Sequence, residues 1–467
     1  MSVATRSINS PALQASLEPL AARIARTATI TALESLPSEV IDKTKICLLD
    51  LIGCAFEARG LPWSRQAVGL AQGVLDGPGA AVIGSPQRVA FGDAAFANAV
   101  MGHGLVREDM HSGSISHLGI VVLPTLLSLA QYSRVCGLDF ISAAVVGYEV
   151  GGKVGRAVMD AEVAKIHRPT GVTGPVAAAA AAGARLLALN VEATTSAIAL
   201  GANTTLGFNQ WAHTGGSEMF FQAGFAARNA LGAVRLAELG AFASPSALDG
   251  KAGLFASLNK RAAADAVELF SGQPEMLAVY HKPIPACNFA QTACQAALRL
   301  SRDEGVAADR IASINVRVPR AGALYPGCDY GGPFAHILQA KMSIQYNVAA
   351  ALILGGVSEK NFTLLNDPLL HRLIGMIKLE VDDAMTRAYP ALQGGEVEVT
   401  EVGGAMHRMR LDNVVNATAQ EVRDRFRSAA AGVVGGERAG EIEQFIDRLE
   451  RSEDVGALGA LLQAVQN

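Results

Sequence analysis

The spacing of apolar residues changes along this chain, and this change most strongly limits the folds open to it. Over roughly the first 265 residues, apolar positions recur every three to four residues, as in amphipathic and buried helices. After Pro37, for example, apolar residues keep helical spacing as far as Phe56, and Gly60 ends the run. This part of the chain is therefore predicted to be helical.

Other segments of the same region carry comparable signals. Residues 138–158 are mostly apolar and predict a helix, and the Ala-rich residues 171–189 predict a buried central helix. Asp93 is placed to cap a helix that runs to about Gly102. Residues 81–83 predict a short strand.

Strand-like alternation appears only beyond residue 265 or so. Residues 311–318 alternate polar and apolar from Ser313 onward, which indicates a half-exposed strand. Residues 377–381, 396–402 and 406–411 resemble it, so about 270–410 is predicted to be α+β. From about residue 417 to the end, the chain is helical and highly charged.

Composition excludes several classes of protein. The 467 residues are 50% hydrophobic and 18% charged, which indicates a well-buried globular protein, and the net charge of −4 gives no sign of a nucleic-acid surface. Mean hydropathy is +0.27, but the apolar runs are shorter than the ~20 residues that a membrane span needs. Met1–Ser10 lacks the apolar core of a signal peptide, and the six cysteines lack disulfide or zinc spacing. A cytoplasmic protein with reduced thiols is expected.

A short polar island interrupts the apolar helices at residues 107–119. It contains two acids, two imidazoles and three serines: Glu108, Asp109, His111, His117, Ser112, Ser114 and Ser116. Polar groups placed between buried helices are costly unless partners satisfy them, so the island predicts a site for general acid–base chemistry. A metal site formed by His103, His111, His117 and Asp109 is the alternative, but the spacing fits no common zinc motif, and no metal is predicted.

A second motif has two interpretations. Residues 147–153 carry the G-x4-G-K frame of a phosphate loop, but Val154 stands where Ser or Thr should follow. Gly147, Gly151 and Gly155 are also four residues apart, which lets two helices approach closely. Close helix packing is the favoured interpretation.

Several segments, in order, resemble those of the MmgE/PrpD family. They are residues 49–54, 103–119, 166–171, 224–228, 282–285 and 341–346. The resemblance implies a mainly α fold, with a large all-helical domain formed by both chain ends (1–268 and 412–467) and an inserted smaller α+β lid domain (269–411). It also implies a homodimer that works without metal or organic cofactor on a small anionic carboxylic acid, by proton transfer at a carbon beside a carboxylate.

The resemblance also assigns candidate residues. His117 matches the histidine of a His-Pro-Gly motif, although Leu118 replaces the proline, and Glu108 and Asp109 match paired acids upstream. His167 matches the histidine of a His-Pro segment, and Lys282 and Tyr346 match a lysine and a tyrosine of the family's pocket. Each also has an ordinary structural interpretation: a core histidine, a helix-end residue, a solvated lysine or a core tyrosine. His111 is additional to the family pattern and is either a loop residue or a replacement for a lost group.

Two departures from the family concern its charged groups. Members with tricarboxylate substrates often carry a lysine and a histidine where this chain has Met219 and Gln222, and a further histidine where it has Gln291. Fewer cations indicate a substrate with fewer than three carboxylates. Glu218 is then a candidate partner for a substrate ammonium, for Arg228, or for solvent alone.

These assignments lead to one preferred function and two alternatives. The preferred function is a cofactor-independent lyase, a dehydratase or decarboxylase, with His117 or His167 as the base. Lys282 would hold the enolate, and Asp109 with Glu108 would orient the imidazole or donate a proton. Glu108, His111, Glu218 and Tyr346 are the candidate substrate-binding residues. The alternatives are an isomerase or epimerase of a small dicarboxylate, and a binding protein that has lost the chemistry.

Overall fold

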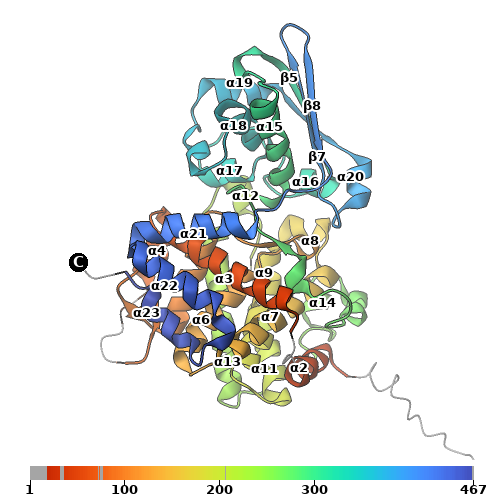
Figure 1. Ribbon diagram of the computed structural model, residues 1–467. Helices are drawn as coiled ribbons and strands as arrows, with labels where there is room; N and C mark the ends of the chain where they lie inside the picture. The colour runs from red at the N-terminus through yellow and green to blue at the C-terminus, as the bar shows by residue number, and fades with distance from the viewer. Residues whose placement is uncertain (1–17, 32–35, 72, 74–76, 206, 465–467) are drawn as a thin grey trace, which may run out of the picture.

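The computed structural model describes residues 18–31, 36–71, 73, 77–205 and 207–464. Met1–Ser10, for which the sequence predicts no targeting signal, lies outside these residues. Two lobes are visible in Figure 1: a large helical body and a smaller lobe that contains a sheet. Among the helices of the described ranges, none is both long and apolar enough to cross a membrane.

Helices from the first half of the chain form most of the large body. They are α2 (Leu20–Ile30), α3 (Ser38–Ala58), α4 (Pro62–Leu70), α5 (Phe91–His103), α6 (Gly119–Tyr132), α7 (Gly137–Val158), α8 (Ala161–Ile166), α9 (Pro169–Gly174), α10 (Ala184–Leu186), α11 (Val191–Ala202), α12 (Trp211–Thr214), α13 (Glu218–Glu238) and α14 (Leu254–Ser257). A π-helical stretch, Pro175–Gly183, joins α9 to α10 and completes the predicted central helix. The helices predicted from Pro37 and from residue 138 are confirmed as α3 and α7.

Two details of the sequence interpretation are wrong. Asp93 does not cap its helix: α5 begins two residues earlier, and the Asp93 carboxylate lies 3.1 Å from Arg228 instead. The short strand is β1 (Ala80–Ala81), paired with β2 (Arg88–Val89), so it begins and ends earlier than expected.

The glycines of α7 serve close packing. A Cβ built on Gly151 would lie 2.6 Å from Leu118 Cδ2, and one on Gly155 would lie 2.3 Å from Ser114 Cβ. Only glycine lets these chains approach so closely. The phosphate-loop alternative is wrong, because residues 147–153 lie inside the continuous helix α7 and form no loop.

The smaller lobe is built on a four-stranded sheet with the order β6-β5-β7-β8. Its strands are β5 (Ile311–Val318), β6 (Ile377–Val381), β7 (Gly395–Glu401) and β8 (Met406–Leu411), close to the predicted segments. β5 and β6 are parallel and the other pairs are antiparallel. The helices of this lobe are α15 (Gln291–Asp303), α16 (Arg320–Leu324), α17 (Ile337–Met342), α18 (Ile344–Leu354), α19 (Pro368–Met376) and α20 (Asp383–Ala388). Ile314, Val316 and Val318 are the buried alternate positions of β5, as its pattern predicts.

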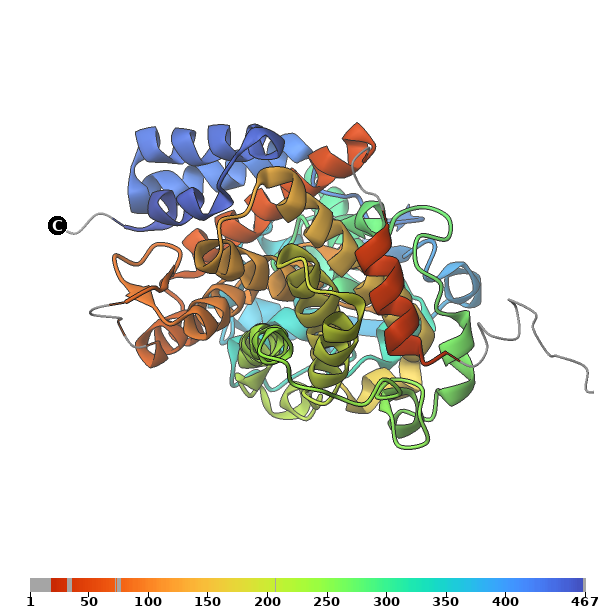
Figure 2. The same ribbon diagram turned by 90° about the horizontal axis from the view of Figure 1, so that it is seen from below.

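The C-terminal helices return to the helical body. α21 (Ala419–Val434), α22 (Gly436–Asp447) and α23 (Leu458–Leu462) lie beside the N-terminal helices in Figures 1 and 2. A Cβ on Gly53 of α3 would lie only 3.2 Å from Phe426 Cα of α21, and the rings of Phe56 and Phe426 are 6.4 Å apart. The mainly α fold class is confirmed; the exact domain boundaries stay a prediction.

Candidate active site

The polar island forms the irregular connection between α5 and α6. Its short strand β3 (Met110–His111) pairs with β4 (Val279–Tyr280), which leads from the helical body towards the sheet lobe. Val106 and Ile115 have φ angles of 59° and 53°. Positive φ is rare for β-branched residues, so surrounding contacts must hold this backbone in place. One such contact joins the loop to α9, where the Thr170 hydroxyl accepts a hydrogen bond of 3.0 Å from the backbone N–H of His117.

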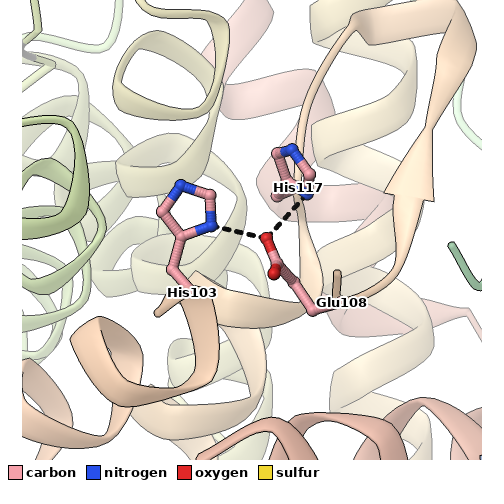
Figure 3. A group of neighbouring side chains, drawn as sticks. All are labelled: His103, Glu108 and His117. Atoms are coloured by element: carbon pink, nitrogen blue, oxygen red, sulfur yellow. Dashed lines mark hydrogen bonds and ion pairs between the residues drawn. The ribbon is translucent and has the colours of Figure 1, made fainter. Parts of the chain in front are cut away.

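A buried carboxylate between two imidazoles lies at the centre of this connection. Glu108 Oε1 is 2.5 Å from His103 Nδ1 and 2.8 Å from His117 Nδ1 (Figure 3). All three side chains are almost fully buried. The second oxygen of Glu108, Oε2, has no hydrogen-bond partner among the described residues.

The contacts of the two imidazoles fix their tautomers. Arg168 Nη2 lies 2.9 Å from His103 Nε2, and because a guanidinium only donates, this nitrogen of His103 is the acceptor. Its Nδ1–H is therefore the donor to Glu108. His117 Nδ1 faces two acceptors, Glu108 Oε1 and, at 3.1 Å, the Asp109 carbonyl oxygen, so Nδ1 carries the proton. The lone pair of His117 Nε2 is left free for another partner.

The charge states follow from burial and from these contacts. Burial opposes ionisation of Glu108, but the two imidazoles outweigh it and hold the pKa of Glu108 well below its usual range. Burial, and then Lys282, lowers the pKa of His117 to about 3. Burial also lowers the pKa of His103. Glu108 is thus an anion between two neutral imidazoles near pH 7.

Two cations, Lys282 and Arg168, lie near the cluster of Glu108 and the two imidazoles. The Lys282 side chain has no exposed surface, and its one recorded hydrogen bond within the described chain is a 3.1 Å donation to the Ala286 carbonyl. Burial lowers the pKa of Lys282 to about 8, against an opposing effect of Glu108. Arg168 also donates to the Tyr325 hydroxyl at 3.2 Å. The Lys282 ammonium therefore keeps N–H donors without a partner in the described part of the chain.

His117 and Arg168 line a narrow cavity with about 10 Å³ open to the centre of a water molecule, and neither Lys282 nor Glu108 is among its lining residues. Its lining residues are Val106, Met110, Ile115, His117, Arg168, Met219, Cys287, Asn288, Phe289, Tyr325 and Met342. They come from the polar island, from the starts of α9 and α13, and from the sheet lobe. The cavity combines a free imidazole nitrogen with a cation, which is the arrangement that proton transfer beside a carboxylate requires.

Residues 22–266 match the MmgE/PrpD N-terminal domain, and residues 284–451 match the MmgE/PrpD C-terminal domain. The chain belongs to the MmgE/PrpD family. It is 31% identical over 216 residues to cis-aconitate decarboxylase of Aspergillus terreus (strain NIH 2624 / FGSC A1156), and 34% identical over 212 residues to cis-aconitate decarboxylase-like protein oryM of Aspergillus oryzae (strain ATCC 42149 / RIB 40). These matches cover 45% and 44% of this chain, and 44% of each relative, so the chain spans less than half the length of these relatives.

For this MmgE/PrpD protein, the structure brings together three residues that the sequence singled out. Glu108, His117 and Lys282 come from separate points of the loop and from the segment after β4, yet they influence each other's ionisation directly. Glu108 was predicted to bind substrate. Its recorded contacts are instead with the two imidazoles, which makes it a positioning group.

Asp109 does not point into the cavity. Its Oδ2 accepts a 2.5 Å hydrogen bond from the Tyr148 hydroxyl, and its Oδ1 accepts one of 3.2 Å from the Gly119 N–H. Burial raises the pKa of Asp109 to about 6. The carboxylate therefore ties the loop to α6 and α7, and only the Asp109 carbonyl reaches His117.

The structure places His167 and His111 away from the carboxylate cluster. The half-buried His167 ring lies beside the exposed Phe208 ring, 5.9 Å between centroids, while Arg168 next to it enters the cavity. His111 Nε2 is 2.6 Å from Glu275, and its Nδ1 is 2.8 Å from the Ser114 hydroxyl. His111 is thus a structural loop residue, and the proposed four-residue metal site is not assembled.

The two other predicted substrate-binding residues also lie elsewhere. Glu218 is exposed in the first turn of α13, whereas its neighbour Met219 lines the cavity. Tyr346 is buried in the sheet lobe, where its hydroxyl donates to the Asn361 carbonyl at 2.8 Å and its ring stacks on Phe362. Neither residue is among those that line the cavity.

His103, Glu108 and His117 are also the one group in the described part of the chain whose ligand atoms lie close enough to share a metal ion. Their chemistry does not favour one. Both Nδ1 atoms act as donors to Glu108, Arg168 occupies the other nitrogen of His103, and Lys282 adds a second positive charge nearby. A divalent cation would have to displace these interactions and withstand the repulsion.

Sequence reasoning missed Arg168 and undervalued His103. A signal for Arg168 existed: the family segment reads His-Pro, and the residue directly before Pro169 in this chain is Arg168, not His167. Gln291 has a structural role. Its side-chain amide donates to the carbonyls of Ile284 and Ala286 at 2.9 and 3.1 Å and so shapes the loop that follows Lys282.

Proposed function

We propose that this protein is a cofactor-independent lyase that removes a proton from a carbon beside a substrate carboxylate. Similarity to cis-aconitate decarboxylases supports a dehydratase or decarboxylase type of reaction. The base is His117, acting through Nε2. The substrate carboxylate binds between Lys282 and Arg168.

One observation carries this proposal: His117 Nδ1 donates to the Asp109 carbonyl and lies 2.8 Å from the Glu108 carboxylate, and Nε2 remains free on a residue that lines the cavity. When Nε2 takes up a proton, the imidazole becomes a cation in contact with the Glu108 carboxylate. That contact favours the charged imidazole and so opposes the two effects, burial and Lys282, that lower the pKa of His117. The arrangement favours a catalytic base over a passive binding group.

The two cations, Lys282 and Arg168, are suited to stabilise the negative charge that forms when the substrate loses its proton. Proton loss next to a carboxylate places negative charge on the carboxylate oxygens, and donors fixed in a buried site stabilise such charge strongly. Lys282 has unused N–H donors, and Arg168 is already oriented by His103 and Tyr325. Both therefore bind the ground state and stabilise the enolate.

Epimerisation is the second candidate, because it needs another proton donor on a different side of the same carbon. Cys287 and Tyr325 line the cavity together with His117 and carry exchangeable protons. A reaction of this type would use the same base but would expel no leaving group.

Proton NMR in heavy water separates these possibilities. The protein is incubated with a set of small unsaturated, hydroxylated and branched carboxylic acids. Release of water or carbon dioxide supports the lyase, and deuterium uptake at the α-carbon without net loss supports the epimerase. Binding of these acids with neither deuterium uptake nor turnover would contradict both and leave a binding protein.

The affinity for carboxylates is expected to fall as the pH rises through about 8. Only protonated Lys282 attracts an anion, and its pKa is about 8 in the free protein, so deprotonation above this value removes one of the two cations. The charged or ionisable groups that influence it are Glu108, Cys287, Arg168 and Cys54. Calorimetric titration with a saturated carboxylate, from about pH 6.5 to about pH 9.5, measures the effect.

Lys282→Met provides the control for this titration. The variant should bind carboxylates weakly at every pH, with a flatter profile across the same range. A wild-type affinity that stays constant up to pH 9.5 or so would show that Lys282 does not contact the anion.

A further inference from the structure

The net charge of the groups around the cavity can balance only a small negative charge on the substrate. Three groups carry most of the charge near pH 7: the Glu108 anion and the cations Arg168 and Lys282. One cation balances Glu108, so the group carries a single excess positive charge. Burial opposes ionisation of Cys287, but the Cys328 thiol, 3.4 Å from it, and Lys282 lower its pKa. A thiolate at Cys287 would cancel the remaining positive charge, and the cavity would then accept even less negative charge on the substrate.

The rest of the lining offers a substrate almost no polar partner. Its apolar members are Val106, Met110, Ile115, Met219, Phe289 and Met342. Asn288 is polar, but both ends of its amide are occupied: Nδ2 donates to Gln393 at 2.8 Å, and Oδ1 accepts from the Tyr280 hydroxyl at 2.5 Å. Of the lining residues, only His117, Arg168, Tyr325 and Cys287 remain to meet polar atoms of a ligand.

Met219 is central to this apolar wall. Its side chain is 1% exposed, and it lines the cavity. A second substrate carboxylate directed at this wall would lose its hydration and gain no partner. A methylene group placed there would instead gain about fourfold in affinity, from the transfer of its surface out of water.

From this contrast between a few charged groups and an apolar wall, we propose that the substrate carries one carboxylate, bound by Lys282 and Arg168. The rest of the substrate is a short apolar chain that lies against Met219, Phe289 and Met342. This proposal rests on the proposed function, because that function places the reacting carbon beside the bound carboxylate. It concerns the rest of the molecule: the charge and the apolar lining of the cavity favour an aliphatic monocarboxylate over a citrate-like tricarboxylate.

Binding of saturated acids tests the proposal without any chemistry. Calorimetry compares hexanoate, which has one carboxylate, with glutarate and with tricarballylate, which have two and three. Hexanoate is expected to bind at least about tenfold more tightly than tricarballylate. Equal affinity, or a preference for tricarballylate, would overturn the proposal.

Met219→Lys adds a cation to the apolar wall. Relative to wild type, the ratio of glutarate affinity to hexanoate affinity should rise about tenfold. Leu239→Lys is the matched control. Leu239 caps the C-terminal end of the same helix, α13, and is 77% exposed, so this variant adds the same charge in contact with solvent. It should leave the affinity ratio unchanged. If Met219→Lys does not fold, Met219→Gln should still weaken hexanoate binding. An unchanged ratio in folded Met219→Lys would place the chain of the ligand elsewhere.

Failure of this inference is distinguishable from failure of the proposed function. If tricarballylate binds better than hexanoate while deuterium exchange still depends on His117, the substrate class is wrong and the chemistry stands. If hexanoate binds selectively and no acid exchanges deuterium or turns over, the cavity is correctly described and the protein is not an enzyme of this type.

Discussion

Replacing His117 with alanine is expected to reduce turnover by about 10²- to 10⁴-fold while the protein remains folded. Nε2 is the free basic nitrogen of His117, a residue that lines the cavity, and Glu108 can stabilise charge only on an imidazole that contacts it. Loss of the side chain leaves Lys282 and Arg168 in place, so substrate should still bind. The effect should therefore appear in kcat far more than in KM.

Deuterium uptake at the α-carbon, followed by NMR, measures this change in the absence of a known product. His167→Ala is the informative comparison, because the sequence offered both histidines as the base and the structure puts the His167 ring beside Phe208. His167→Ala should retain nearly full exchange. Exchange within about tenfold of wild type in His117→Ala would remove His117 from the mechanism.

The helices and strands of this protein could largely be predicted from sequence. Periodicity located α3 and α7, and alternation located β5 to within a residue at each end. These signals are strong because each element buries one face over many residues, and the pattern repeats. The failures were local. The start of α5 was set at Asp93, a good cap by type, although Asp93 instead pairs with Arg228 in α13.

The candidate site was less predictable, because side-chain direction in an irregular loop is not periodic. The sequence places Glu108 and Asp109 side by side, and nothing in it states which carboxylate meets the imidazoles. The backbone conformation determines which carboxylate contacts them. Val106 lies in the left-handed region, Glu108 contacts the two histidines, and Asp109 binds Tyr148. Arg168 was missed for a similar reason, since the extra residue between His167 and Pro169 changes which side chain enters the cavity.

Glu108→Gln should separate the charge of this residue from its shape. Glutamine is nearly isosteric, and its amide oxygen can still accept from His103 and His117. It cannot neutralise the imidazolium that forms at His117 during proton transfer, with Lys282 and Arg168 close by. We expect kcat to fall by about 10²- to 10³-fold. KM should not rise, because the excess positive charge in the cavity increases by one unit and attracts the substrate anion more strongly.

The pH profile distinguishes this positioning role from a merely structural one. Glu108 raises the pKa of Lys282, so its neutralisation should move the alkaline loss of carboxylate binding to a lower pH than the wild-type value of about 8. Asp109→Asn is the matched control. It removes a neighbouring carboxylate that binds Tyr148 and Gly119, and Asp109 is not among the main groups that influence Lys282. A drop in kcat with an unshifted pH profile in Glu108→Gln would mean that Glu108 only supports the loop. A downward shift, absent in Asp109→Asn, would tie the buried anion both to the base on one side and to the substrate-binding cation on the other.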